Sequence, residues 1–143
     1  MKPMDEERGE DVITVYTDGA SSGNPGPAGL GVVLLYRAHR KEISRALGVA
    51  TNNVAELTAV KVALETIRNR KLPVRIHTDS TYVIGVLGGG WKAKENLDLI
   101  AEIRSLIADF ASVEFVKVPA HAGVTENERA DELARLGAAQ SAA

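Results

Sequence analysis

The sequence predicts an α/β domain in which helices cover the faces of a mixed sheet. Strand-like runs of β-branched residues come first, and apolar residues then recur every three or four positions, as in amphipathic helices. Two further short strand runs alternate with those helices. This order is typical of a mixed sheet with packed helices. The 143 residues contain no internal repeat and fit one domain.

Three strands are predicted in the N-terminal part. Residues 12–17 are mostly β-branched or aromatic and run into an Asp-Gly pair, which indicates a turn. Residues 20–29 are rich in Gly, Pro and Asn and predict a loop. Residues 31–37 and 42–48 then predict two strands that complete an antiparallel meander with the first.

Helical periodicity starts at Asn53 and extends to Ile67. Asn52 or Asn53 is expected to cap this helix. The elements expected next are a strand at 74–78, a short helix at 80–87, a helix at 99–110 and a strand at 113–118. Thr125 and Glu128 have the spacing of a capping box, which predicts a last helix ending near Leu136.

The two ends of the chain are expected to be tails. Residues 1–11 are acidic and lack an apolar period, so a flexible tail is predicted there, with the domain at 12–137 and a second flexible tail at 138–143. The acid excess lies entirely in the first tail, which leaves the remaining residues slightly basic. The formal net charge of -2 therefore does not exclude a polyanionic partner.

Composition excludes several kinds of site. The chain has no cysteine, which rules out disulfides, thiolate zinc sites and a cysteine nucleophile, so a bound metal must sit on oxygen or imidazole. No apolar run approaches the ~20 residues of a membrane-spanning helix, and the N-terminus is charged where a signal peptide is apolar. We therefore expect a soluble cytoplasmic protein without a membrane partner.

Four carboxylates are predicted to converge at one edge of the sheet. Asp18 and Asp79 follow strands, while Glu56 lies in the first turn of the helix after the meander and Asp131 in the last helix. Gathered acids repel one another and need cations. Magnesium prefers oxygen ligands, and two such ions about 3.5–4 Å apart can activate water in phosphodiester cleavage.

Each acid also has a simpler explanation. Asp18 suits an Asp-Gly turn, and Asp79 suits a helix N-cap. Glu56 can complement a helix dipole, and Asp131 can be a solvated helix acid. Spacing alone does not decide between these alternatives.

Six segments occur in an order that is specific as a set. They are TDG at 17–19, GNPGP at 23–27, TNNVAEL at 51–57, TDS at 78–80, HAG at 121–123 and NERADELA at 127–134. Together they resemble type 1 ribonuclease H over residues 12–136. The resemblance implies a five-stranded mixed sheet in the order 3-2-1-4-5, with the first three strands antiparallel and helices on both faces.

The resemblance also implies a reaction. Asp18, Glu56, Asp79 and Asp131 match the metal-binding acids of the family, which imply two Mg²⁺ ions with Mn²⁺ as a substitute. His121 matches a loop histidine that assists proton movement or product departure, and its alternative is a solvent-facing loop residue. The implied enzyme is a monomeric endonuclease with no obligate protein partner. It cuts the RNA strand of RNA–DNA hybrids and leaves 5′-phosphate and 3′-hydroxyl ends.

The residues matched to substrate binding are polar or small. They are Gly19, Ser21, Asn24, Thr51, Asn52, Asn53, Ser80, Lys92 and Lys94. Contacts to 2′-hydroxyls would confine cutting to RNA, and helix capping is the alternative role for the Asn pair. The chain lacks the extra helix and basic loop, called the handle, of some bacterial members, so weak and salt-dependent binding is expected. It also has Thr81 where many relatives have Gln.

Two other functions remain open at this stage. A related nuclease of the same superfamily would act on DNA or duplex RNA with the same acids. A non-catalytic hybrid-binding module would be expected to lack a carboxylate, and none of the four is missing.

Overall fold

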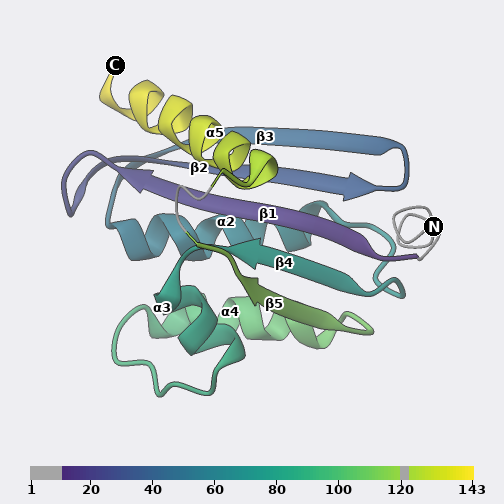
Figure 1. The fold of residues 1–143 in the computed structure, drawn as a ribbon. Coiled ribbons are helices and arrows are strands. Elements are labelled where there is room, and N and C mark those ends of the chain that lie inside the picture. The colour runs from purple at the N-terminus through teal and green to yellow at the C-terminus, as the bar shows by residue number, and fades with distance from the viewer. Residues whose placement is uncertain (1–10, 120–122) are drawn as a thin grey trace.

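A single mixed sheet organises the protein (Figure 1), whose computed structural model describes residues 11–119 and 123–143. Its strands are β1 (Ile13–Ser21), β2 (Gly26–Tyr36), β3 (His39–Ala50), β4 (Val74–Thr78) and β5 (Val113–Lys117). They lie in the order β3-β2-β1-β4-β5. The first three pair antiparallel, whereas β4 is parallel to β1 and β5 is parallel to β4. The predicted sheet is confirmed.

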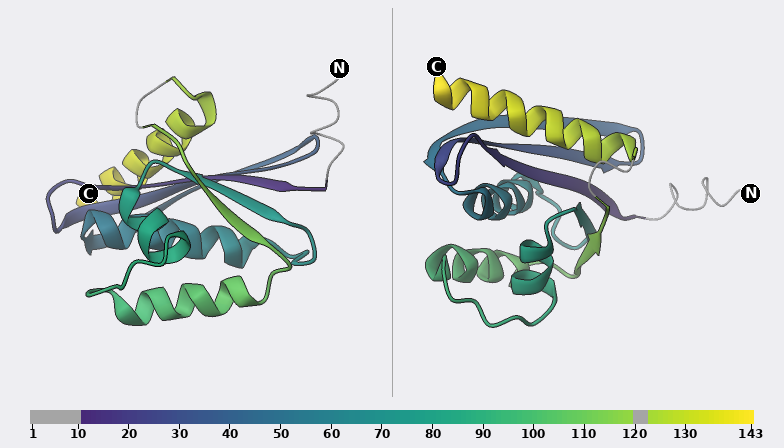
Figure 2. Two further views of the ribbon diagram at one scale, coloured as in Figure 1. Left: turned by 60° about the horizontal axis from the view of Figure 1, so that its bottom comes forward. Right: turned by 60° about the vertical axis from the view of Figure 1, so that its left-hand side comes forward.

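Helices cover both faces of the sheet in three layers (Figure 2). One face carries α2 (Asn52–Thr66), with α4 (Leu97–Ala108) packed beside it, and the other carries α5 (Thr125–Ala142). Between β4 and α4 the chain forms α3 (Thr81–Val83) and a π-helical turn, η1 (Ile84–Gly88). None of the helices in the described part of the chain is long and apolar enough to cross a membrane.

The main core lies between the sheet and α2. Leu57, Val60 and Leu64 of α2 are fully buried there, and burying each such side chain contributes about 1.5–3 kcal/mol. Val15 and Ile76 meet them from the sheet. A smaller cluster of Val33, Ala130 and Leu133 joins β2 to α5.

Glycines in β2 let α5 lie directly on the sheet. A Cβ atom on Gly31 would lie 2.1 Å from the carbonyl oxygen of Ala130, and one on Gly29 would lie 2.2 Å from the amide nitrogen of Ala138. Both distances are far below van der Waals contact, so a larger residue would push α5 away from the strand. This close packing fixes the height at which α5 presents Asp131 over the sheet.

Pairing of β1 with β2 extends further than predicted. The two strands remain paired to Ser21 and Ala28, so Asp18 lies inside β1 and not at its end. Backbone hydrogen bonds form this pairing, and a composition rich in glycine and proline does not report them. The predicted loop at 20–29 is therefore too long, and β2 begins at Gly26.

The predicted starts of two helices are corrected. Thr51 caps α2, with its hydroxyl accepting from the amide of Val54 at 3.1 Å, so neither Asn52 nor Asn53 is the cap. Glu56 consequently lies beyond the first turn of α2. The Thr125–Glu128 capping box does not form, because α5 already includes Thr125 and has no side-chain cap.

The predicted C-terminal tail at 138–143 is wrong, because α5 continues to Ala142. Ser141 anchors this last turn to the sheet. Its hydroxyl donates to the carbonyl of Ala28 at 2.6 Å and accepts from the amides of Leu47 at 3.1 Å and Gly48 at 2.9 Å. The hydroxyl thus provides hydrogen bonds where the pairing of β2 and β3 shifts register.

Candidate active site

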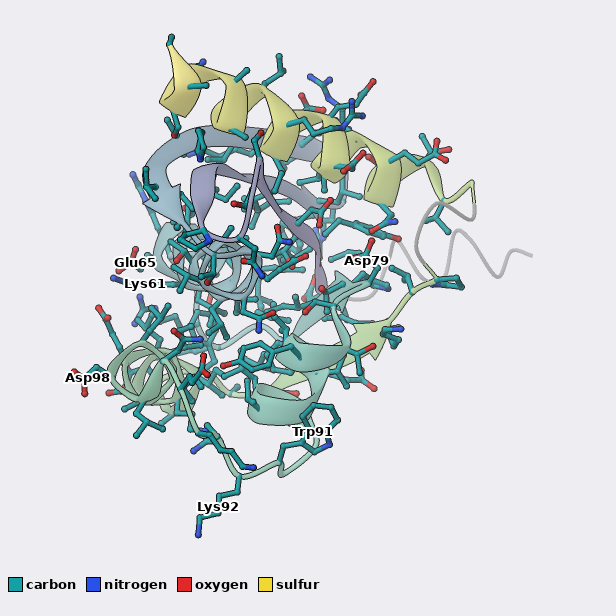
Figure 3. All side chains as sticks on the ribbon, turned by 90° about the vertical axis from the view of Figure 1, so that its left-hand side faces the viewer. Lys61, Glu65, Asp79, Trp91, Lys92 and Asp98 are labelled. Atoms are coloured by element: carbon teal, nitrogen blue, oxygen red, sulfur yellow. The ribbon has the colours of Figure 1, made fainter. Side chains whose placement is uncertain are left out.

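Three carboxylates from separate elements converge near the middle of the sheet. Asp18 comes from β1, Glu56 from α2 and Asp79 from the end of β4. Each offers an oxygen, and the three oxygens lie within 4.8 Å of one another. We call these three residues the acid cluster. Figure 3 shows Asp79 above α3, with Trp91 and Lys92 on the loop below it.

Gly19 explains why two of these acids meet. A Cβ atom at Gly19 would lie 2.5 Å from both the carbonyl carbon of Ala55 and the amide nitrogen of Glu56. The backbones of β1 and α2 therefore touch at this point, which brings Asp18 and Glu56 together. The amide of Gly19 also donates to Oδ1 of Asp18 at 2.9 Å. The acid cluster therefore requires a glycine at position 19, because any side chain there would collide with the backbone of α2.

The acid cluster is electrostatically strained without a cation. Asp18 is only 5% exposed. Burial, then the charge of Asp79, raises the pKa of Asp18 to about 8. Burial and the charges of Asp18 and Asp79 likewise raise the pKa of Glu56 well above its usual value. Clustered acids gain stability from a divalent cation, which replaces the protons they otherwise retain.

The donor set fits a hard metal ion. Oε1 of Glu56 is buried and has no hydrogen-bond partner among the described residues. Buried polar atoms are normally paired, so this oxygen is free for a ligand. Three carboxylates within reach of one point supply the oxygen coordination that Mg²⁺ and similar ions prefer.

Asp131 lies beside the acid cluster on α5. Asp131 contributes to raising the pKa of Asp18, after burial and the charge of Asp79, which places the two side chains next to each other. Oδ2 of Asp131 accepts from Nε of Arg135 at 3.0 Å. The structure therefore brings three predicted acids together and puts the fourth adjacent to them, already paired with a cation.

The simpler explanations for two acids fail on geometry. Asp18 is paired within β1, so it is not a turn residue. Ser80, and not Asp79, caps α3, because its hydroxyl accepts from the amide of Val83 at 3.1 Å. His121 lies outside the described residues, and its role stays a prediction.

Several predicted substrate residues hold the loop between β1 and β2 and the start of α2. Ser21 donates from its hydroxyl to the carbonyl of Ala50 at 2.9 Å. Asn24 accepts on Oδ1 from the amide of Asn52 at 3.0 Å. Ser21 and Asn24 thus join the loop to the end of β3 and the start of α2, and with the Thr51 cap they shape this surface through its backbone.

A groove beside α3 gathers other predicted residues. Asn53, Lys92 and Lys94 line it, although they are distant in sequence, and its volume is about 330 Å³. Tyr82 and Trp91 also line it, and Trp91 is 52% exposed. Sequence reasoning did not assign these two aromatic residues to the site, although an aromatic beside lysines is a signal for nucleic-acid contact.

Two further features concern this region. The ring of Trp91 packs against Gly85, where a Cβ atom would lie 2.2 Å from the indole. A larger groove of about 390 Å³ lies beside η1 and β5, but the acid cluster does not line it. The smaller groove is thus the one that contains predicted substrate residues.

Fold and site together define an α/β protein with a cluster of three carboxylates on a 3-2-1-4-5 sheet. The sequence model of the RNase H family matches residues 10–139. The chain belongs to the ribonuclease H family. This confirms the predicted resemblance and, with it, the prediction that the protein is a hydrolase.

Individual relatives agree with this membership. Ribonuclease H of Desulforamulus reducens is 45% identical over 142 residues, covering 90% of this chain and 88% of that protein. Ribonuclease H of Aromatoleum aromaticum is 46% identical over 140 residues, covering 89% of this chain and 90% of that protein. The relatives therefore match over nearly their whole length.

Solved structures show the same fold. The N-terminal RNase H domain of Rv2228c from Mycobacterium tuberculosis superposes with a TM-score of 0.81 at 33% identity, covering 94% of this chain and 100% of that one. LC11-RNase H1, isolated from compost by a metagenomic approach, was solved in complex with an RNA/DNA hybrid. It superposes with a TM-score of 0.78 at 31% identity, covering 92% of this chain and 99% of that one.

The structure of residues 89–96 also shows that the handle, the extra helix and basic loop of some bacterial members, is missing. Residues 89–96 lead from η1 to α4 without an intervening helix. The groove lysines therefore lie on a short connection and not on a separate protrusion.

Proposed function

We propose that the protein is an endonuclease that cuts the RNA strand of RNA–DNA hybrids by a two-metal-ion reaction, leaving 5′-phosphate and 3′-hydroxyl ends. The observation that carries the proposal is the convergence of Asp18, Glu56 and Asp79 oxygens within 4.8 Å. Family membership and the hybrid bound to LC11-RNase H1 support the choice of substrate.

The four acids would hold two Mg²⁺ ions, with Mn²⁺ as a substitute. When bound, such ions activate an attacking water and stabilise the leaving oxygen. The contribution of the chain is to present carboxylates in a fixed, buried arrangement. Asp18 and Glu56 release protons as cations bind, because burial and mutual repulsion raise their pKa values.

Residues around the acids would position the hybrid. Asn53, Lys92 and Lys94 would contact its backbone in the groove, and backbone groups near Gly19 and Asn24 would meet the 2′-hydroxyls of the RNA strand. His121 would assist proton movement or product departure. We further propose that the protein acts as a cytoplasmic monomer.

The rival function is a nuclease that acts on DNA or duplex RNA. The test compares cleavage of an RNA–DNA hybrid, duplex DNA and duplex RNA, each with MgCl₂ and with EDTA. The proposal expects cleavage of the hybrid alone, only with MgCl₂. Equal cleavage of duplex DNA would refute the substrate assignment.

A matched pair of variants tests the mechanism. Asp18→Asn removes one acid of the cluster, whereas Asp98→Asn makes the same change at an exposed position on α4 (Figure 3). Loss of a supporting residue around a metal typically costs 10–100-fold, so loss of Asp18 should cost more than about 100-fold. Asp98→Asn should cleave like the unmodified protein. Full activity of Asp18→Asn would refute the mechanism.

A further inference from the structure

Asp131 differs from the acid cluster in having a cation of its own. Nε of Arg135 lies 3.0 Å from Oδ2 of Asp131, one helical turn along α5. The structure records no ion pair for Asp18, Glu56 or Asp79 among the described residues. Among the residues that the structure describes, Arg135 is thus the cation that pairs with an acid of the proposed four-acid site.

We propose that Arg135 is an internal counter-ion that competes with a divalent cation for Asp131 and thereby sets the metal affinity of the site. The inference rests on the proposed function, because it assumes that Asp131 is a metal ligand. Arg135 acts through Asp131 and is a positioning residue, not a catalytic one.

The exposure of the two side chains suits such a competition. The Arg135 side chain is 64% exposed, so it can turn into solvent, whereas the Asp131 side chain is only 24% exposed and stays at the site. Arg135 has no second acid partner among the described residues. Its release therefore breaks one exposed ion pair and no larger network.

Arg129, near the start of α5, is held differently. Arg129 pairs with Glu42 at 2.9 Å and with Glu132 at 3.1 Å. The Arg129 side chain is fixed in place because it pairs with one acid on β3 and one on α5. Arg129 therefore supplies a matched control, because it carries the same charge on the same helix but does not contact Asp131.

The size of the effect follows from two contributions. A divalent cation at Asp131 must displace Arg135 or accept repulsion from it. An exposed ion pair and a solvent-screened repulsion each contribute modestly, so removing Arg135 should tighten metal binding about two- to fivefold. Removing Arg129 should change it less, because that charge is farther from Asp131 and already neutralised.

The experiment is calorimetric titration of the full chain with MgCl₂ at constant ionic strength. It compares the unmodified protein with Arg135→Gln, Arg135→Lys and Arg129→Gln. We expect Arg135→Gln to bind Mg²⁺ about two- to fivefold more tightly, Arg135→Lys to stay near the unmodified protein because it keeps the charge, and Arg129→Gln to change less than Arg135→Gln. Equal or weaker binding by Arg135→Gln, or equal tightening by Arg129→Gln, would overturn the proposal.

Thermal unfolding gives a second readout that needs no activity. In EDTA, Arg135→Gln should unfold at a lower temperature than the unmodified protein, because the metal-free acids lose their neighbouring positive charge. Adding MgCl₂ should then raise the unfolding temperature of Arg135→Gln by more than it raises that of the unmodified protein. An unchanged rise would count against the inference.

Asp18→Asn separates the two ideas. If the unmodified protein shows no Mg²⁺ binding that Asp18→Asn removes, the proposed function fails at its metal site. If it does bind Mg²⁺ there and Arg135→Gln changes nothing, the counter-ion inference alone fails.

Discussion

The protein contains two groups of carboxylates in opposite electrostatic states. In the acid cluster, burial and neighbouring charges raise the pKa of Asp18 to about 8. On the other side of α5, hydrogen bonds from Arg129 and Arg40 lower the pKa of Glu42 to about 2. Arg40 also contacts Glu126 at 2.8 Å, so the hairpin of β2 and β3 is joined to the first turn of α5. We call these four residues, Arg40, Glu42, Glu126 and Arg129, the ion-pair network.

The difference separates structure from function. Glu42 in the ion-pair network is matched by two arginines and needs nothing further to be ionised. Asp18 and Glu56 in the acid cluster have no arginine or lysine partner among the described residues and are ionised only at a free-energy cost. A fold keeps such a cost where a ligand offsets it, which is why perturbed carboxylates indicate functional sites.

The acid cluster and the ion-pair network should differ most strongly in how a Glu→Gln substitution affects hybrid cleavage. Glu56→Gln removes a proposed metal ligand, and we expect hybrid cleavage to fall more than about 100-fold. Glu42→Gln should retain activity within about threefold, since an exposed ion pair contributes about 1 kcal/mol or less. Initial cleavage rates in MgCl₂ measure both. Comparable losses in the two variants would remove the distinction.

The stability of the metal-free protein should depend on pH through the acid cluster. Asp18 binds its proton more tightly in the folded state than in the unfolded chain, so its contribution is fully present below about pH 4 and is lost as pH rises through about 8. We expect the free energy of unfolding in EDTA to fall across that window by up to about 1.4 kcal/mol per pH unit, relative to Asp18→Asn. Denaturant titrations at several pH values measure it.

The direction of that change is the decisive part. If the unmodified protein gained stability relative to Asp18→Asn as pH rose, the pKa of Asp18 would be lowered and not raised. Adding MgCl₂ should flatten the dependence, because the cation takes the place of the protons.

Stability should also respond to the two glutamates in opposite directions. In EDTA at neutral pH, Glu56→Gln should stabilise the protein by about 1–2 kcal/mol, because the buried carboxyl must take up a proton or ionise among like charges on folding, and Gln does neither. Glu42→Gln should destabilise it by about 0.5–1 kcal/mol, because it leaves two arginines without that partner. Denaturant midpoints measure both, and a shift of the same sign in the two variants would contradict the comparison.

The smallest effect is expected in the groove, whose lysines form a third electrostatic environment. Lys92 and Lys94 are exposed and positioned for phosphates. A plot of log affinity for the hybrid against log salt has a negative slope. Replacing one of these lysines with Ala should reduce the magnitude of that slope by about 1. Fluorescence anisotropy in Ca²⁺ or EDTA over a salt series measures this slope. A slope unchanged by both substitutions would place the hybrid elsewhere.

Much of the fold was predictable because its signals are local. Hydrophobic periodicity and composition predicted the strands and helices. The ordered motifs, through the family resemblance, predicted the sheet order and the four acids. Asp18 was misplaced relative to its strand end, since backbone pairing past Gly19 leaves no trace in side-chain pattern. The C-terminal turn was missed because Ser141 is held by groups far away in sequence.

The site itself was predictable only in part, because contacts between residues distant in sequence form it. The contact between Gly19 and the backbone of α2 requires the packed structure, as does the groove that joins Asn53 to Trp91. The Asp131–Arg135 spacing is visible in the sequence, but its importance depends on Asp131 lying beside Asp18. Tertiary proximity is the information that local patterns lack.

Anomalous diffraction from a crystal soaked with MnCl₂ tests the central claim most directly. The proposal predicts anomalous peaks coordinated by oxygens of Asp18, Glu56 and Asp79, at about 2.1–2.3 Å as expected for a hard divalent ion. Well-occupied peaks only at other surface acids, or carboxylates of the acid cluster turned away from one another around an empty site, would contradict it.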